Sequence, residues 1–214
     1  MRYLIPLTLA LSAGTAAAST PTLGGPMSHL LVTLFQNQVY LTFESPAMST
    51  VSMQGNEGDF VGDASLLNNM GYNAQFGWLA NGFISLPPDS GIFMRTLSSS
   101  PHLNVYEEST FNPIFGTDGS DDVWQWDGTM THNWYSTETH GSHWARYEVF
   151  VGDLFGNPLD GYTSASIDLT FEYGPDLSGR IGVKNSPSIG ALPTPGVMST
   201  LGIGIVAAGR RRRS

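Results

Sequence analysis

Three stretches of the chain alternate apolar and polar residues with a period of two, and this alternation most constrains the fold. They are residues 38–44, 143–151 and 164–173. Because successive side chains of a strand point to opposite faces, the pattern predicts β-strands that bury one face. The apolar sets are Val39, Leu41 and Phe43, then Ala145, Tyr147, Val149 and Val151, and finally Ala165, Ile167, Leu169, Phe171 and Tyr173.

The rest of the body also predicts strands. Weaker strand patterns occupy residues 30–35, 74–79, 83–86, 91–97, 103–107 and 123–127. Turn residues in "GDLFGNPLDGYTS" predict a long hairpin connection between the last two strands, and "DASLLNNMG" predicts a short helix with Asp63 as N-cap and Gly71 near the C-cap. About nine short strands with 25 glycines and 13 prolines indicate an all-β fold, an antiparallel β-sandwich or jelly roll.

The N-terminus has the pattern of a secretory signal peptide. Arg2 is followed by an apolar run from Tyr3 to Leu11, and small residues precede Ser19, near which we expect cleavage. This predicts four parts: a signal peptide over 1–18, a β-sandwich domain over 19–177, a linker over 178–192 and a C-terminal signal over 193–214.

The C-terminal segment "LPTPGVMSTLGIGIVAAGRRRRS" is unlike the end of a folded domain. From Gly196 to Gly209 it holds 14 uncharged residues, about 21 Å as a helix, against about 30 Å of bilayer core. We therefore expect a short hydrophobic helix that is a marginal membrane segment. Four arginines follow, and the positive-inside rule places them on the cytoplasmic face, with the bulk of the chain outside.

Both ends together resemble the PEP-CTERM class of bacterial surface proteins, which are sorted by an exosortase. The resemblance covers about the last 22 residues and rests on Pro193 and Pro195, on the apolar segment from Leu201 to Gly209, and on Arg210, Arg211, Arg212 and Arg213. Thr194 stands where the family usually has glutamate. The resemblance implies export in a Gram-negative bacterium, a transient tether in the inner membrane, an exosortase-type sorting enzyme as partner, and delivery to the cell surface or extracellular polysaccharide.

Charge and cysteine content exclude several functions. Without Arg2 and the terminal arginines, the body has four basic against 18 acidic residues, a formal net charge of −14. Such a field repels nucleic acid and favours solubility or divalent cations. The absence of cysteine excludes thiol nucleophiles and cysteine-based zinc sites.

Residues 118–144 hold the candidate metal ligands. His140 and His143 have H-x-x-H spacing, and His132 lies nearby, so a structural zinc is one reading. Gly141 argues against a shared helical face, and loop histidines that face solvent or cap turns are the alternative. Asp118 and Asp122 fit part of a calcium loop, although Val123 stands where glycine is needed. We expect no required cofactor, with structural calcium or zinc left open.

The same stretch holds four of the five tryptophans. Exposed Trp124, Trp126, Trp134 or Trp144 would suit glycan binding, because an indole packs on the apolar face of a sugar; core aromatics are the alternative. The acidic pairs Glu107-Glu108 and Asp121-Asp122 would point to opposite faces in strands, so neither is automatically a catalytic dyad. No G-x-S-x-G or phosphate-loop motif occurs.

These observations predict an exported, non-enzymatic protein of the cell surface or extracellular matrix with a structural or adhesive role. Exopolysaccharide is an expected partner. The alternative is an extracellular module that binds a glycan or a divalent metal.

Overall fold

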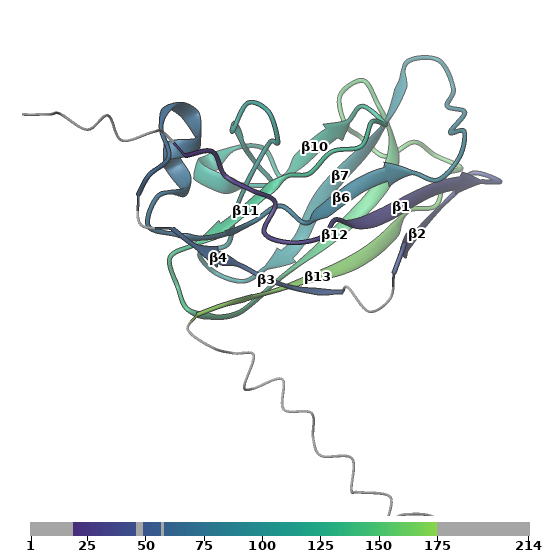
Figure 1. Ribbon diagram of the computed structural model, residues 1–214. Coiled ribbons are helices and arrows are strands. Elements are labelled where there is room, and N and C mark those ends of the chain that lie inside the picture. Colours follow the sequence, from purple (N-terminus) through teal and green to yellow (C-terminus); the bar gives the residue numbers. More distant parts are fainter. Residues whose placement is uncertain (1–18, 46–48, 57, 175–214) are drawn as a thin grey trace, which may run out of the picture. The chain divides into compact units, whose positions relative to one another are not determined.

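The computed structural model describes residues 19–45, 49–56 and 58–174. The predicted signal peptide, linker, C-terminal helix and sorting signal lie outside these residues. Within them the all-β expectation is confirmed, since strands in three sheets form a sandwich-like fold with two short 3-10 helices (Figure 1). No helix of the described residues has the length and apolar character that crossing a membrane requires.

One layer is a five-stranded sheet built around the longest strand. In β13 and in the first part of β12, buried residues alternate with more exposed ones, as the sequence predicts. β12 pairs antiparallel with β7 on one side and with β13 on the other, and the last pairing confirms the predicted long hairpin. In order, the strands are β10 (Val123–Trp126), β7 (Ser90–Ser99), β12 (Gly141–Asp153), β13 (Ala165–Tyr173) and β3 (Thr50–Ser52).

Two smaller sheets pack against the inner face of this layer. The first has the order β2 (Gln38–Phe43), β1 (Ser28–Phe35) and β6 (Phe76–Ala80). The second has the order β4 (Gln54–Gly55), β5 (Gly71–Asn73), β11 (Trp134–Thr137), β8 (Asn104–Tyr106) and β9 (Pro113–Ile114). The chain passes from one sheet to the other between β5 and β6, so the two sheets are covalently linked through residues 74–75.

Two of the three sheets are mixed, and the sheet β4-β5-β11-β8-β9 is antiparallel throughout. β1 pairs with β6 in parallel, and β13 pairs with β3 in parallel, while the other ladders are antiparallel. Parallel pairs need long connections between their strands. Here the described part of the connection from β1 to β6 contains β2, β3, β4, β5 and a 3-10 helix.

Aromatic side chains join the layers. Phe171 of β13 lies against Phe76 of β6 and Tyr135 of β11, with ring centroids 5.3 Å and 4.6 Å away. Trp78 of β6 meets Tyr147 of β12 edge to face, at 6.1 Å. All five rings are buried, so they form the centre of a single core that all three sheets share.

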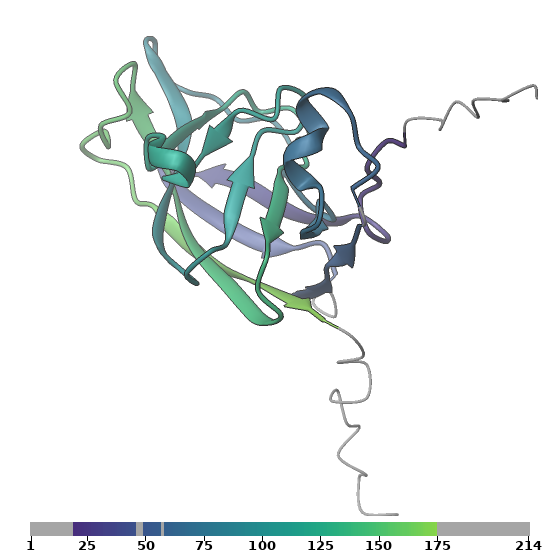
Figure 2. The ribbon, with the colours of Figure 1, turned by 90° about the vertical axis from the view of Figure 1, so that its left-hand side faces the viewer.

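A second apolar cluster lies beneath the predicted helix. The helix is a 3-10 helix, η2 (Gly62–Leu67), drawn as the blue coil in Figure 2. Leu67 packs with Tyr72 and Trp134 of the second small sheet. The predicted caps are wrong. Val61 occupies the N-cap position, Asp63 lies inside the first turn without a cap bond, and Gly71 begins β5. The second 3-10 helix is η3 (Thr117–Gly119).

Residues 83–86 were the one incorrect strand prediction. Residues 30–35, 74–79, 91–97, 103–107 and 123–127 do contain strands, with bounds shifted by a few residues. Residues 83–86 instead run without a ladder, and the Phe83 side chain is 91% exposed. Pro87 and Pro88 follow directly, and proline cannot donate the hydrogen bonds that a ladder requires.

We expect Phe171→Ala to lower the free energy of unfolding by about 3–5 kcal/mol, because the change leaves a cavity at the contact between the layers. Phe155→Ala is the matched control, since Phe155 is 88% exposed in the connection between β12 and β13. Urea denaturation of both variants measures the difference. A loss below about 1 kcal/mol for Phe171→Ala would contradict the central role of this contact.

Candidate functional site

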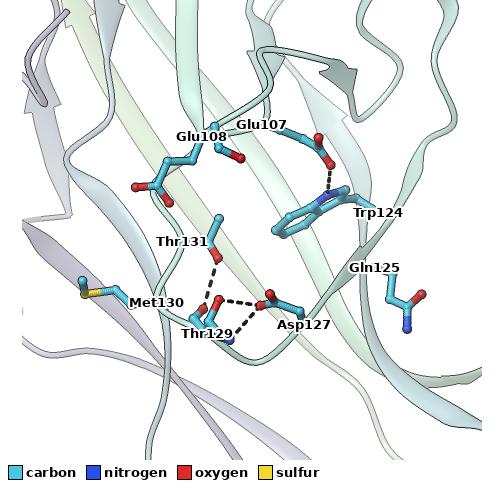
Figure 3. A pocket seen from close by; sticks show the side chains of 9 residues that line it. Glu107, Glu108, Trp124, Gln125, Asp127, Thr129, Met130 and Thr131 are labelled. Atoms are coloured by element: carbon cyan, nitrogen blue, oxygen red, sulfur yellow. Dashed lines mark hydrogen bonds between the residues drawn. The ribbon is translucent and has the colours of Figure 1, made fainter.

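A pocket of about 260 Å³ opens where the loop after β8 meets β10 and the loop that follows it (Figure 3). β10 delivers an indole to its wall, and both loops deliver carboxylates. The side chains that define it are Glu107, Glu108, Trp124, Asp127, Thr129 and Thr131. We call it the carboxylate pocket. Within the described residues, no lysine or arginine lines it, so it is a negatively charged site.

Glu107 is held in place by three donors. Its Oε1 accepts a hydrogen bond from Trp124 Nε1 at 3.0 Å, and its Oε2 accepts bonds from the Thr110 hydroxyl and the Asn112 amide. Partial burial by itself raises the pKa of Glu107, but these bonds to the charged form outweigh it, so the pKa lies below its ordinary value. Glu107 is therefore a fixed, ionised acceptor that orients the indole.

Glu108 ties the second loop to the first, and Asp127 fixes a turn within the second loop. Glu108 Oε2 accepts the backbone N–H of His132 at 2.9 Å. Asp127 Oδ1 accepts both the hydroxyl and the N–H of Thr129, and these bonds hold the pKa of Asp127 below its ordinary value. In Figure 3, Glu107 and Asp127 lie on either side of the Trp124 indole. The pocket is thus shaped by hydrogen bonds within its own walls.

This arrangement can accept hydrogen bonds from hydroxyl or ammonium groups and can pack an apolar face against the indole. Acid catalysis fits it less well. A glycosidase general acid needs a raised pKa, whereas the pKa values of Glu107 and Asp127 are lowered. No three His, Asp or Glu residues of the described chain lie close enough to hold a metal ion. The geometry therefore suits a ligand that presents hydroxyl or ammonium groups beside an apolar face.

The histidine candidates are held at separate places. His132 is buried, its Nδ1 lies 2.8 Å from the Ala74 carbonyl oxygen, and its ring covers Gly77 so closely that a Cβ there would lie 2.5 Å from ring atoms. His143 is buried with Nε2 at 2.7 Å from the Thr139 carbonyl oxygen. His140 is exposed and lies against the Tyr173 ring. Each position has a structural explanation of its own.

The structure places His132 beside His29, which the sequence analysis does not predict as a candidate ligand. The rings of His29 and His132 are 5.6 Å apart between centroids, and His29 Nδ1 lies 2.6 Å from Glu44 Oε2. Asp118 lies in η3, and Asp122 follows η3. Both are separated in sequence from His29 and His132, and both are exposed. Asp118 takes a left-handed conformation, with φ of 52°.

The four nominated tryptophans divide by exposure. Trp126 and Trp134 are buried, and their Nε1 atoms donate to the carbonyl oxygens of Thr129 and Glu108. Trp124 is half-buried in the wall of the carboxylate pocket. Trp144 alone among the four is exposed, at 44%. A core role therefore accounts for two of them, and two remain available to a ligand.

The carboxylate pocket was not predicted from the sequence. Glu107 and Glu108 were expected to point apart as strand neighbours, but β8 ends at Tyr106 and both lie in the following turn. There both side chains line one pocket. The turn-forming residues between Glu107 and Asn112 could have predicted this, because they end the strand before the acidic pair.

Comparison with known proteins finds no matching family model, no matching curated protein and no matching solved structure.

The lowered pKa of Glu107 gives a testable pH dependence. Its ionised form is favoured in the folded state, so its contribution to stability is complete above the ordinary value of 4.5 and is lost as the pH falls through the lower folded value. Glu107→Gln should destabilise the protein by about 1 kcal/mol at neutral pH, and the difference from wild type should shrink as the pH falls below 4.5 and through the lower folded pKa.

Urea denaturation at several pH values measures this, with the exposed Glu138→Gln as control. A difference that stays constant with pH would contradict the assignment of Glu107 as an ionised acceptor.

Proposed function

We propose that this chain is an exported, non-enzymatic protein of the bacterial cell surface or its extracellular matrix, with a structural or adhesive role. The observation that carries the proposal is the order of three signals at the end of the sequence: Pro193-Thr194-Pro195, the apolar segment, and Arg210 to Arg213. The body agrees with an extracellular role, because it is a cysteine-free, strongly acidic β-sandwich.

In this proposal each part of the tail has a physical task. The two prolines interrupt regular structure and present an extended site to an exosortase-type enzyme. The apolar segment tethers the exported chain in the inner membrane for a time. The arginines stop translocation and stay on the cytoplasmic face.

Cell fractionation and intact-mass spectrometry test the sorting step in the native host. The wild-type protein should reach the surface fraction without the residues that follow the proline motif. Replacing Arg210 to Arg213 by serine should remove the topological stop, so that the chain is secreted unprocessed or retained in the periplasm. An intact tail on the surface form would contradict processing and leave a plain membrane anchor.

A second candidate function is glycan binding, favoured by the carboxylate pocket. Its ionised oxygens accept hydrogen bonds from sugar hydroxyls, and the threonine hydroxyls beside them can donate or accept. The Trp124 indole supplies an apolar wall. The divalent-metal alternative has no comparable support within the described residues, because no three suitable side chains converge there.

Titration of the protein with neutral and acidic oligosaccharides, followed by tryptophan fluorescence, tests this candidate. Glu108→Gln keeps the size of the side chain but removes its charge, and should weaken binding at the pocket by about tenfold or more. Glu138→Gln, an exposed site elsewhere, should leave it unchanged. Absence of any fluorescence change across the panel would contradict a ligand beside Trp124.

A further inference from the structure

The outer face of the five-stranded sheet carries a second hollow, of about 480 Å³, on the side away from the core. It is lined by Ser98, Ser142, Trp144, Arg146, Asp168 and Thr170, which come from β7, β12 and β13. We call it the Trp144 groove. It contains none of the residues that line the carboxylate pocket.

The strand register builds this groove. Ser142, Trp144 and Arg146 are alternate residues of β12 and share its exposed face, which spans about 13 Å along the strand. Across the ladders, Trp144 is opposite Thr170, and Arg146 stands opposite Asp168 on one side and Ser98 on the other. These side chains therefore form adjacent rows on one surface.

An irregularity in β7 places Ser98 in its row. The register shifts between Arg146 and Tyr147 of β12. Ser98 pairs with Arg146, and Thr96 pairs with Tyr147. Leu97 is the extra residue of this bulge. Without the bulge, Leu97 would stand opposite Arg146 in place of Ser98, and the groove would lose that hydroxyl.

The groove contains a preorganised polar pair. Arg146 Nε and Nη2 donate to Asp168 Oδ1 and Oδ2 at 2.7 Å and 2.8 Å, which is a bidentate arrangement. The pair raises the pKa of Arg146 and lowers that of Asp168, so both stay charged at neutral pH and cancel each other's charge. Their remaining N–H groups and lone pairs face solvent and can bond hydroxyl groups.

Trp144 supplies the apolar component. Its side chain is 44% exposed beside these polar groups, whereas Trp126 and Trp134 of the same stretch are buried. An exposed indole next to a fixed polar pair and three hydroxyl side chains matches a ligand with one apolar face and many hydroxyls. A pyranose has that chemistry, because its C–H face packs on an aromatic ring while its hydroxyls exchange hydrogen bonds.

The charge of the protein selects among polysaccharides. The groove's own ion pair is neutral, while the body around it carries a formal net charge of −14. A polyanionic chain would be repelled by that field, and a neutral chain would not. We propose that the Trp144 groove binds a segment of a neutral polysaccharide, with a sugar ring packed on Trp144. This inference goes beyond the carboxylate pocket and does not depend on it.

Affinity electrophoresis of the mature protein tests the proposal, with gels that contain a β-glucan, a xylan or a polyuronate. Wild type should be retarded by at least one neutral polysaccharide and less by the polyuronate. Trp144→Ala should weaken the affinity at least tenfold, and Trp144→Phe should recover part of it. Phe155→Ala, which removes an exposed aromatic outside the groove, should bind as wild type.

Three results would overturn the proposal: no retardation by any neutral polysaccharide, equal retardation of wild type and Trp144→Ala, or stronger retardation by the polyuronate. Glu108→Gln separates the two sites. If it abolishes retardation while Trp144→Ala does not, the ligand binds at the carboxylate pocket and the groove proposal fails. Thermal melting of each variant confirms that it is folded.

Discussion

The packing of aromatic rings between the sheets is the interaction on which the rest of the structure depends. The chain has no cysteine, so no disulfide links the layers. Phe171 contacts rings from both small sheets, and Trp78 with Tyr147 closes the same core at another point. Strand ladders hold each sheet together, but these contacts hold the sheets to one another, and burial of such rings is the largest available source of that stability.

The sequence predicted the strands that obey a simple rule. β13 and the first part of β12 bury mainly one face, so their residues alternate and the pattern is visible. β5 and β11 were not predicted as strands, because they are buried on both faces and include polar residues such as Asn73 and Ser136. Their sequences therefore show no alternation of apolar and polar residues. The strand expected at residues 83–86 had the right composition but no neighbouring strand to pair with.

The candidate sites were less predictable than the strands, because they depend on which loops meet. The acidic pair Glu107-Glu108 after β8 is well separated in sequence from Trp124 of β10. The fold brings them together, with a hydrogen bond between Glu107 and Trp124. The exposure of the tryptophans was equally hard to predict. The alternation of Trp124 and Trp126 favours core positions for both, but Trp124 is half-buried and Trp126 is buried. Trp144 is one of the alternate residues of β12 that face solvent, so its exposure could have been predicted from alternation alone.

The position of β13 within its sheet has a mechanical consequence. β13 is the last described strand, yet it is an interior strand, paired over nine residues with β12 and over three with β3. A pulling force applied at Gly174 along the strand would load both ladders at once instead of peeling off an edge. Resistance to forced unfolding is set by the rate at which such ladders break. Unfolding by force from that end therefore requires the two ladders of β13 to break together.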